Sequence, residues 1–449
     1  MFTFNTIGII RVQTVISWET PPILGKLGYT LNPRGKGEIM DDQARARKGN
    51  IILVMCWLAW IVNYVDRMIL PPLLPLIIIE LGLSLTEAGL LMSSFMFGYA
   101  AMQLPSGFLS DRFGRKIVLS LGMVGYSVTT FLSGISPSFS LLLVCRILTG
   151  VFQGTHLSVA NALLSDFFPP NRRGRAIGIH ESGPNVGATI AVPFATLIGA
   201  TSGWRNAFIT ASLPGILMAV LFFVLVPSSS REHDNNARQD SVSRTSFKWK
   251  SLLPFIVAFS AYGLANWALY TFVPTYLSTK GIPLVSVGFI FATLPFVGIF
   301  SKMFGGTLSD RIGRGKVIVS ALMLLGPLMY MLTILKHSAE LAVVLACIGF
   351  VLFSFSPVIY ANVSDLCGSS QRSRALGTVS AIGNIIGAIS PVIVGVIADR
   401  TNFETAFVVI TIIVLASGCL VALIMKFTSL VPQGRVSVPF DSKETVMER

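Results

Sequence analysis

The sequence predicts an all-α membrane protein whose twelve transmembrane helices form two similar halves of six. Composition, the length of the apolar segments and an internal repeat lead to this prediction. Of the 449 residues, 53% are hydrophobic and 12% are charged, about half of the ~25% charged residues of a soluble domain. The apolar residues fall in twelve blocks, mostly long enough to span a membrane, which takes about 20 residues. A soluble globular protein is therefore excluded.

The twelve blocks divide around one long polar segment, residues 227–249, which is rich in Ser, Asn, Asp and Arg and reads as a cytoplasmic linker. The predicted halves are residues 50–226 and 250–426, flanked by cytoplasmic segments 1–49 and 427–449. The blocks cover roughly 51–79, 85–109, 117–135, 140–168, 175–200, 206–226, 250–276, 284–308, 316–335, 340–367, 374–398 and 404–426.

The basic residues predict the orientation in the membrane, because cytoplasmic loops carry an excess of Lys and Arg. With both termini in the cytoplasm, 23 of the 34 Lys and Arg residues lie on the cytoplasmic side and four lie outside. This distribution explains the net charge of +13 without a nucleic-acid partner. We expect a multi-pass protein of the cell membrane, acting as a monomer.

The first 39 residues match no targeting signal, since Arg11 interrupts the one apolar stretch that resembles a signal peptide. The codons for residues 35–38 are purine-rich and resemble a ribosome-binding site just before Met40. We expect translation to start at Met40, the alternative being a disordered extension.

The two halves repeat one another at an offset of 199 residues. One offset that relates separated motifs indicates a duplication of six helices, and two similar halves around a midplane site are typical of transporters. The matching segments are 107–115 with 306–314, 165–166 with 364–365, 173–178 with 372–377, Asn185 with Asn384, and 207–208 with 406–407.

The duplicated motif, G-x-x-x-D-R-x-G-R at 107–115 and 306–314, resembles the signature of the major facilitator superfamily. Residues 63–67, N-Y-V-D-R, are similar to the N-Y-x-D-R of its anion:cation symporter branch, which includes sugar-acid and hexuronate carriers. The resemblance covers about residues 45–426. It implies a secondary transporter that moves a small carboxylate or sugar acid by alternating access, with protons or Na⁺ as the coupling ion.

Two departures from that branch leave an alternative open. Carriers with N-Y-x-D-R often have a Glu, tied to proton coupling, seven residues after an Arg of helix 4. Here Gln153 follows Arg146 at that spacing and cannot titrate. Helix 5 instead contains His180-Glu181 and a Gly-Pro motif at 183–187, which overlaps the pattern of drug:proton antiporters. Proton-driven efflux of amphipathic compounds is therefore the alternative, and a transport-inactive membrane sensor is a third class.

Charged and polar residues inside the predicted helices are the candidate substrate site, because a charge placed mid-membrane costs ~2.5–3.5 kcal/mol on insertion scales. Arg67 lies halfway along helix 1 and offers a fixed fork of donors for a carboxylate. An ion pair with Asp66 is the structural alternative, although neighbours on a helix point about 100° apart. Arg146 is a second anion contact or a structural pair. Further cavity-lining candidates, each equally able to make an interhelical hydrogen bond, are Tyr99, Gln103, Asn185, Tyr270 and Asn384.

Four residues are candidates for proton coupling. Asp66 can carry a proton, because burial favours the neutral form of a carboxyl group, or can be a fixed partner of Arg146. His156 and His180 can titrate near neutrality, although a hydrogen-bonded interior histidine is the commoner outcome. Glu181 is the next candidate after Asp66.

The duplicated loop motifs predict charge clusters that hold the cytoplasmic helix ends together, with a solvated loop of little energetic weight as the alternative. The cluster residues are Asp111, Arg112, Arg115 and Asp166, repeated as Asp310, Arg311, Arg314 and Asp365. Glu181 and Lys302 lie at similar predicted depth, so we expect an ion pair that closes a cytoplasmic gate. The alternative is a Lys302 side chain that reaches the cytoplasm while Glu181 titrates alone.

Nothing in the sequence predicts an enzyme, a cofactor or a metal site. The sequence contains no G-x-S-x-G, phosphate-binding loop or H-E-x-x-H motif. The five cysteines have neither metal-ligand spacing nor a disulfide framework. The predicted partners are the lipid bilayer, a small anionic substrate and a coupling ion.

Overall fold

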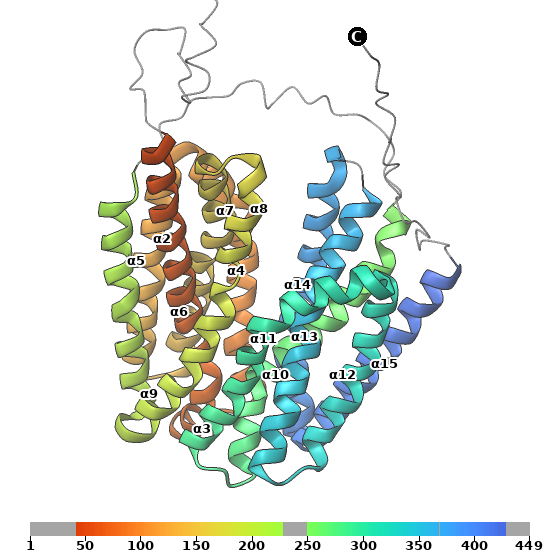
Figure 1. The fold of residues 1–449 in the computed structure, drawn as a ribbon. Helices are drawn as coiled ribbons and strands as arrows, with labels where there is room; N and C mark the ends of the chain where they lie inside the picture. Colours follow the sequence, from red (N-terminus) through yellow and green to blue (C-terminus); the bar gives the residue numbers. More distant parts are fainter. Residues whose placement is uncertain (1–41, 228–248, 368, 428–449) are drawn as a thin grey trace, which may run out of the picture. The chain divides into compact units, whose positions relative to one another are not determined.

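The computed structural model describes residues 42–227, 249–367 and 369–427, which are almost entirely helical (Figure 1). Met40, most of the linker and the C-terminal tail lie outside the described residues. Residues 1–51 and 52–449 form separate compact units, and the first contributes only the opening turns of α2 to the description.

The predicted blocks are helical in the described chain, with helix ends close to many of the block boundaries. The first lobe contains α2 (Asp42–Met68), α3 (Leu70–Leu81), α4 (Leu85–Phe113), α5 (Arg115–Gly134), α6 (Phe139–Gln153), α7 (His156–Phe167), α8 (Pro170–His180) and α9 (Gly183–Leu225). The second contains a short 3-10 turn (Trp249–Leu252), α10 (Leu253–Thr279), α11 (Leu284–Ile312), α12 (Arg314–Ile334), α13 (Ser338–Leu366), α14 (Ser369–Arg400) and α15 (Phe403–Phe427).

Ten segments of the described chain are long and apolar enough to cross a membrane. One of them, Arg172–Leu225, is 54 residues long and covers two predicted blocks. The chain turns inside it at Gly203, whose φ of 84° and ψ of 160° are not helical; a positive φ favours glycine because it has no Cβ. The other predicted block without its own segment is α4, whose 29 residues include several Ser and Gly.

Three predicted membrane helices of the first lobe are interrupted. Helix α2 gives way to α3 at Ile69, just before two prolines; α6 gives way to α7 at Gly154, and α8 to α9 at Glu181. At Gly154, a Cβ would lie 2.5 Å from the carbonyl oxygen of Tyr99, so close packing of α4 demands glycine. Broken helices at membrane depth are tolerated where they line a cavity, and transporters use them to build binding sites.

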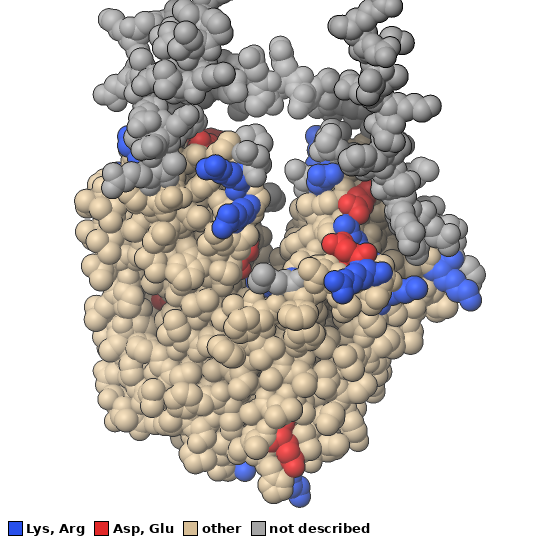
Figure 2. Space-filling model, in the orientation of Figure 1, with Lys and Arg blue, Asp and Glu red and all other residues tan. Residues whose placement is uncertain are grey.

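The two lobes meet at one end and separate at the other. At the end where α4 begins, a Cβ on Gly89 would lie 2.3 Å from the carbonyl oxygen of Pro391, and one on Gly288 would lie 2.0 Å from Oγ1 of Thr196. Small residues of this kind let helix backbones approach closely. At the opposite end, Figure 2 shows an open cleft between the lobes, with Lys and Arg on its rims.

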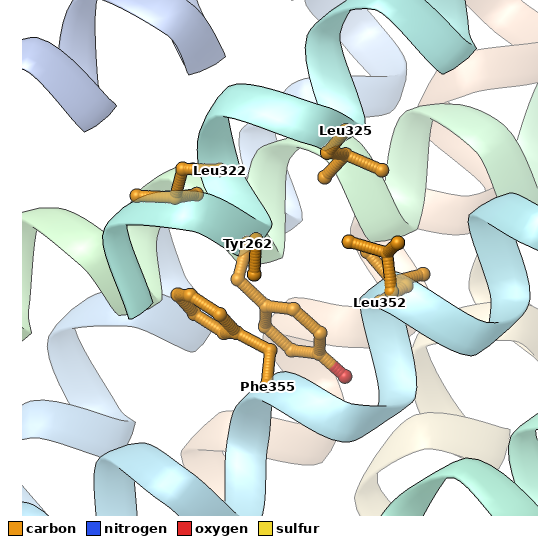
Figure 3. A pocket seen from close by; sticks show the side chains of 7 residues that line it. Tyr262, Leu322, Leu325, Leu352 and Phe355 are labelled. Atoms are coloured by element: carbon orange, nitrogen blue, oxygen red, sulfur yellow. The ribbon is translucent and has the colours of Figure 1, made fainter. Parts of the chain in front are cut away.

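A second hollow, inside the second lobe between α10, α12 and α13, has no room for a substrate. Its volume is about 10 Å³, and its lining is apolar apart from Tyr262 (Figure 3). A single water molecule needs about that much space together with several polar partners. This hollow is therefore excluded as a substrate site.

Candidate functional site

Arg67 lies at the centre of the first lobe's interior, 3% exposed. Asn63 stands one helical turn before it on the same face of α2, and its Oδ1 accepts a hydrogen bond from Nη2 of Arg67 at 3.5 Å. Nε of Arg67 donates to Oε1 of Gln153 at 3.2 Å. Among the described residues, no carboxylate oxygen lies within 4.0 Å of this guanidinium group. Its charge is therefore available for an anionic ligand.

Aromatic rings from α2 and α4 surround the Arg67 guanidinium group. Its Cζ lies 4.4 Å from the ring centres of both Tyr64 and Tyr99, 5.2 Å from that of Phe95 and 5.8 Å from that of Trp60. Such cation–π contacts strengthen as water is removed. They hold the side chain back toward the start of α2 and leave it flat against an aromatic wall.

Gln153 joins Arg67 to Asp66. Its Nε2 donates to Oδ1 of Asp66 at 2.8 Å while its Oε1 accepts from Arg67. The direct ion pair between these two sequence neighbours is not formed, in keeping with their angular separation on the helix. From the sequence, Gln153 is expected only to be unable to titrate. The structure makes it the link between the anion-binding cation and a buried carboxyl group.

The two interior histidines meet at the interruptions of α6–α7 and α8–α9. Nε2 of His180 lies 3.4 Å from Nε2 of His156, and the indole of Trp60 stacks on His156 with ring centres 4.5 Å apart. Nε1 of Trp57, which lies on α2 like Trp60, donates to Oγ of Ser182 at 3.0 Å. These contacts fix both broken helices against α2, beside Arg67. Of the two alternatives for these histidines, this geometry resembles the hydrogen-bonded interior histidine.

Arg146 lies apart from Arg67, and its role as a second substrate contact stays a prediction beside the structural alternative. Its Nη2 donates to hydroxyl groups of Thr130, Ser133 and Thr149 at 3.0–3.3 Å, and its Cζ lies 5.1 Å from the ring centre of Phe208. At 1% exposed, it is about as deeply buried as Arg67. It packs the interior of the first lobe.

The other predicted lining residues separate into different places. Asn185 donates to the carbonyl oxygen of Pro295 at 3.3 Å and so ties α9 to α11. Tyr270 is buried against the rings of Phe291 and Phe353. Gln103 and Asn384 are half-buried on α4 and α14. Only Tyr99 of this set contacts Arg67.

The duplicated charge clusters form within each lobe. Arg115 pairs with Asp166, and in the second lobe Arg314 pairs with both Asp310 and Asp365. These pairs join neighbouring helices of one lobe while the cleft between lobes stays open. Asp111, Arg112 and Arg311 are exposed, and no ion pair of theirs occurs within the described residues.

The predicted Glu181–Lys302 ion pair is replaced by a different contact. Nζ of Lys302 donates to the backbone carbonyl oxygen of Glu181 at 3.1 Å, whereas the Glu181 carboxylate leans toward His180, with Oε1 3.9 Å from Nδ1. Helix α8 ends at His180, so the Glu181 carbonyl is a helix-end acceptor available to outside donors. The contact exists while the cleft is open, so the closed cytoplasmic gate built on Glu181 and Lys302 stays a prediction.

Asp399, which sequence reasoning missed, connects the lobes at their closed end. Its Oδ1 accepts from the backbone N–H of Leu85, and its Oδ2 accepts from the N–H of Thr86, both at 2.8 Å. Oγ1 of Thr86 adds a third bond at 2.5 Å. A carboxylate of α14 thus caps the start of α4, where free N–H groups and the helix dipole favour an anion. Nothing local predicts a contact between residues 313 positions apart.

The described residues contain no cluster of three or more His, Cys, Asp or Glu that could hold a metal ion. The assembled site is instead a buried guanidinium in an aromatic box, linked to a buried carboxyl group and flanked by two broken helices. This arrangement can bind and neutralise a small anion and exchange protons, but it holds no nucleophile placed against a general base.

Comparisons with known proteins identify the family and the fold of this chain. A family model described as the Major Facilitator Superfamily matches residues 56–355 and 287–444. The hexuronate transporter of Bacillus subtilis is 28% identical over 378 residues, which cover 79% of this chain and 90% of that protein. The probable sulfoacetate transporter of Cupriavidus necator is 28% identical over 389 residues, 80% of this chain and 89% of that protein.

Among solved structures, a bacterial homologue of the human lysosomal transporter Spinster, crystallised in an inward-facing and unoccupied conformation, superposes with a TM-score of 0.75. The match covers 86% of this chain and 98% of the other at 17% sequence identity, so the likeness concerns the fold.

Proposed function

The chain belongs to the Major Facilitator Superfamily, a family of membrane transporters rather than enzymes, and on this premise we propose that it carries a small organic anion across the cell membrane. The substrate is a carboxylate or sugar acid, and it moves together with protons. The relatives named for hexuronate and sulfoacetate support this class, since both compounds are small organic anions.

The observation that carries the proposal is that Arg67 has no carboxylate paired directly with it among the described residues. An arginine at mid-membrane depth needs an anion to offset its charge, yet the carboxylate of its neighbour is engaged through Gln153 instead. A guanidinium fork binds a carboxylate through two parallel hydrogen bonds. The substrate's anionic group supplies the missing partner.

Alternating access is the transport mechanism in this proposal. The cleft opens at the end rich in Lys and Arg (Figure 2), which the positive-inside rule assigns to the cytoplasm. We propose that this conformation is inward-facing and that both termini are cytoplasmic. Rocking of one lobe against the other then exposes the same site to the outside.

Counterflow in proteoliposomes tests the function. Vesicles containing the purified protein and one unlabelled carboxylate are diluted into a trace of its labelled form, with a pH-sensitive dye trapped inside. We expect uptake of at least one sugar acid or short carboxylate, accompanied by a change of internal pH. Movement of amphipathic cations with no organic anion exchanged would instead support the efflux alternative.

The closed end yields a prediction of its own. Replacing Asp399 by alanine removes three hydrogen bonds to a charged acceptor, each of which contributes ~1.5–3 kcal/mol before exposure is considered. Because the group is exposed, we expect a net effect of about 1.4 kcal/mol, a roughly tenfold shift toward the outward-facing state. Spin labels at Ser140 and Ser338, exposed near the closed ends of α6 and α13, should report a larger separation.

Glu404→Gln is the matched control, since it removes an exposed carboxylate in the first turn of α15 at the same end. Its distance distribution should equal that of the unmodified protein. An unchanged distribution in Asp399→Ala as well would mean that the cap does not hold the closed end together.

A further inference from the structure

We propose that Lys302 is a second anion-binding residue on the opposite lobe from Arg67, so that the site selects substrates with two anionic groups. This inference rests on the proposed function and specifies its substrate class.

Lys302 is a charged residue inside α11 whose donors are mostly unused. An ammonium group has three N–H donors, and within the described residues Nζ has one hydrogen bond, to the Glu181 carbonyl oxygen. Nζ also lies 5.9 Å from the ring centre of Phe353. No carboxylate oxygen of the described residues lies within 4.0 Å of it. The Glu181 carboxylate interacts with this ammonium group electrostatically but does not form a close ion pair with it, so N–H donors of a cation at membrane depth remain for a ligand.

The two cations point toward one another along the membrane normal. Side chains on a helix lean toward its N-terminus, and α2 runs away from the open end of the cleft whereas α11 runs toward it. The Arg67 guanidinium group follows this rule, since it lies over Tyr64 and Trp60, three and seven residues earlier. The Lys302 side chain leans from the open end back toward the middle of the cleft.

The start of α9 lies between α2 and α11. Its contacts with both helices show how far apart residues of α2 and α11 lie along the helix axis. A Cβ on Gly187 would lie 2.7 Å from Cβ of Tyr64 on α2, and a Cβ on Gly298 of α11 would lie 2.4 Å from Nδ2 of Asn185. The Lys302 ammonium group touches Glu181, six residues before Gly187. At 1.5 Å per residue, the Lys302 ammonium group lies roughly 9 Å along the helix axis from the level of the Tyr64 Cβ atom. The Arg67 guanidinium group contacts the rings of both Tyr64 and Trp60, and a Cβ on Gly183 would lie 3.3 Å from Cβ of Trp60. The axial offset of the two cations is therefore smaller than this distance, which suits a short dianion that bridges the lobes.

The internal repeat argues against a purely structural role for Lys302. At the offset of 199 residues, its equivalent is Gln103, and the equivalent of Glu181 is Ser380. Both equivalents are polar and uncharged, and Ser380 donates to the hydroxyl oxygen of Tyr360 within its own lobe at 3.3 Å. A charge required only for packing the lobes would be expected at both boundaries. Lys302 is an addition at one of them.

Matched pairs of substrates test the proposal. Galactarate and galacturonate share a six-carbon skeleton with two carboxylates and one; succinate with succinic semialdehyde, and sulfoacetate with glycolate, make similar comparisons. Binding to the purified full-length protein is measured by competition with a labelled substrate. We expect the dianion of at least one pair to bind more than tenfold tighter than its monoanion. Lys302→Met should abolish this preference by weakening the dianion alone, and Lys302→Arg should retain it.

Lys316→Met, at an exposed position on α12, is the control for loss of one positive charge. Equal binding of both members of every pair by the unmodified protein would overturn the assignment. So would equal weakening of dianion and monoanion in Lys302→Met, because that is the result of a general conformational effect. If no compound binds, or if Arg67→Lys binds them normally, the proposed function fails as well. If the monoanions bind through Arg67 without a dianion preference, the function stands and the role of Lys302 falls.

Discussion

Replacing Arg67 by lysine is expected to weaken binding of the organic anion by more than tenfold, or ~1.4 kcal/mol. Lysine keeps the positive charge but replaces a planar fork of donors by a point charge. It also loses the flat contacts with Tyr64 and Tyr99, whose ring centres lie 4.4 Å from Cζ, and the hydrogen bond to Gln153. Calorimetry or a competition assay on detergent-purified protein measures the affinity directly.

Arg146→Lys is the matched control, because that arginine is equally buried but donates to three hydroxyl groups of its own lobe. We expect a lower Tm with the substrate affinity changed less than about twofold, since one or two hydrogen bonds of a packed interior are lost. If Arg67→Ala folds and binds the anion normally while Arg146→Lys loses binding, the two residues have been assigned the wrong way round.

The helices could be predicted because membrane insertion requires long apolar segments and the duplication supplies a second copy of each. The interruptions could not, because their causes are tertiary. Gly154 ends α6 where the backbone of α4 comes within 2.5 Å of a would-be Cβ, and no pattern in residues 140–168 marks that approach. The interruption at Glu181 has the larger consequence, since it leaves the carbonyl oxygen that Lys302 binds.

Site residues could be predicted where a single charged residue inside a membrane helix costs free energy. They could not be predicted where the role of a residue depends on a partner far away in the sequence. Arg67 and Asp66 stand out because charges are rare inside membrane helices. The similar predicted depth of Glu181 and Lys302 indicated that these residues would meet. It did not indicate that the contact would be between the Lys302 ammonium group and the Glu181 carbonyl oxygen. The roles of Gln153 and Asp399 depend on partners 86 and 313 or more residues away, which one sequence without such contacts cannot reveal.

Asp66→Asn is expected to abolish accumulation driven by a pH gradient while leaving exchange of substrate intact. Asparagine keeps the shape of the side chain and an oxygen that can accept from Nε2 of Gln153, as Oδ1 of Asp66 does at 2.8 Å, but it cannot take up or release a proton. Oδ2 of Asp66 is buried and is the carboxyl oxygen that Gln153 does not contact, so we expect the proton on this atom. Proteoliposomes with an imposed pH gradient measure accumulation, and counterflow at equal pH measures exchange.

The expected effect of Asp66→Asn depends on charge rather than packing, so the control variant must remove a charge elsewhere. Glu340→Gln removes an exposed carboxylate from the first turn of α13 and should leave both accumulation and exchange unchanged. In Asp66→Asn the bridge through Gln153 persists, so Arg67 stays in place and still binds the anion; a variant that loses exchange too has lost the site and not merely the proton. Accumulation that survives in Asp66→Asn would place the coupling proton elsewhere. Glu181 and the His156–His180 pair, whose Nε2 atoms are 3.4 Å apart, would then be the groups to replace next.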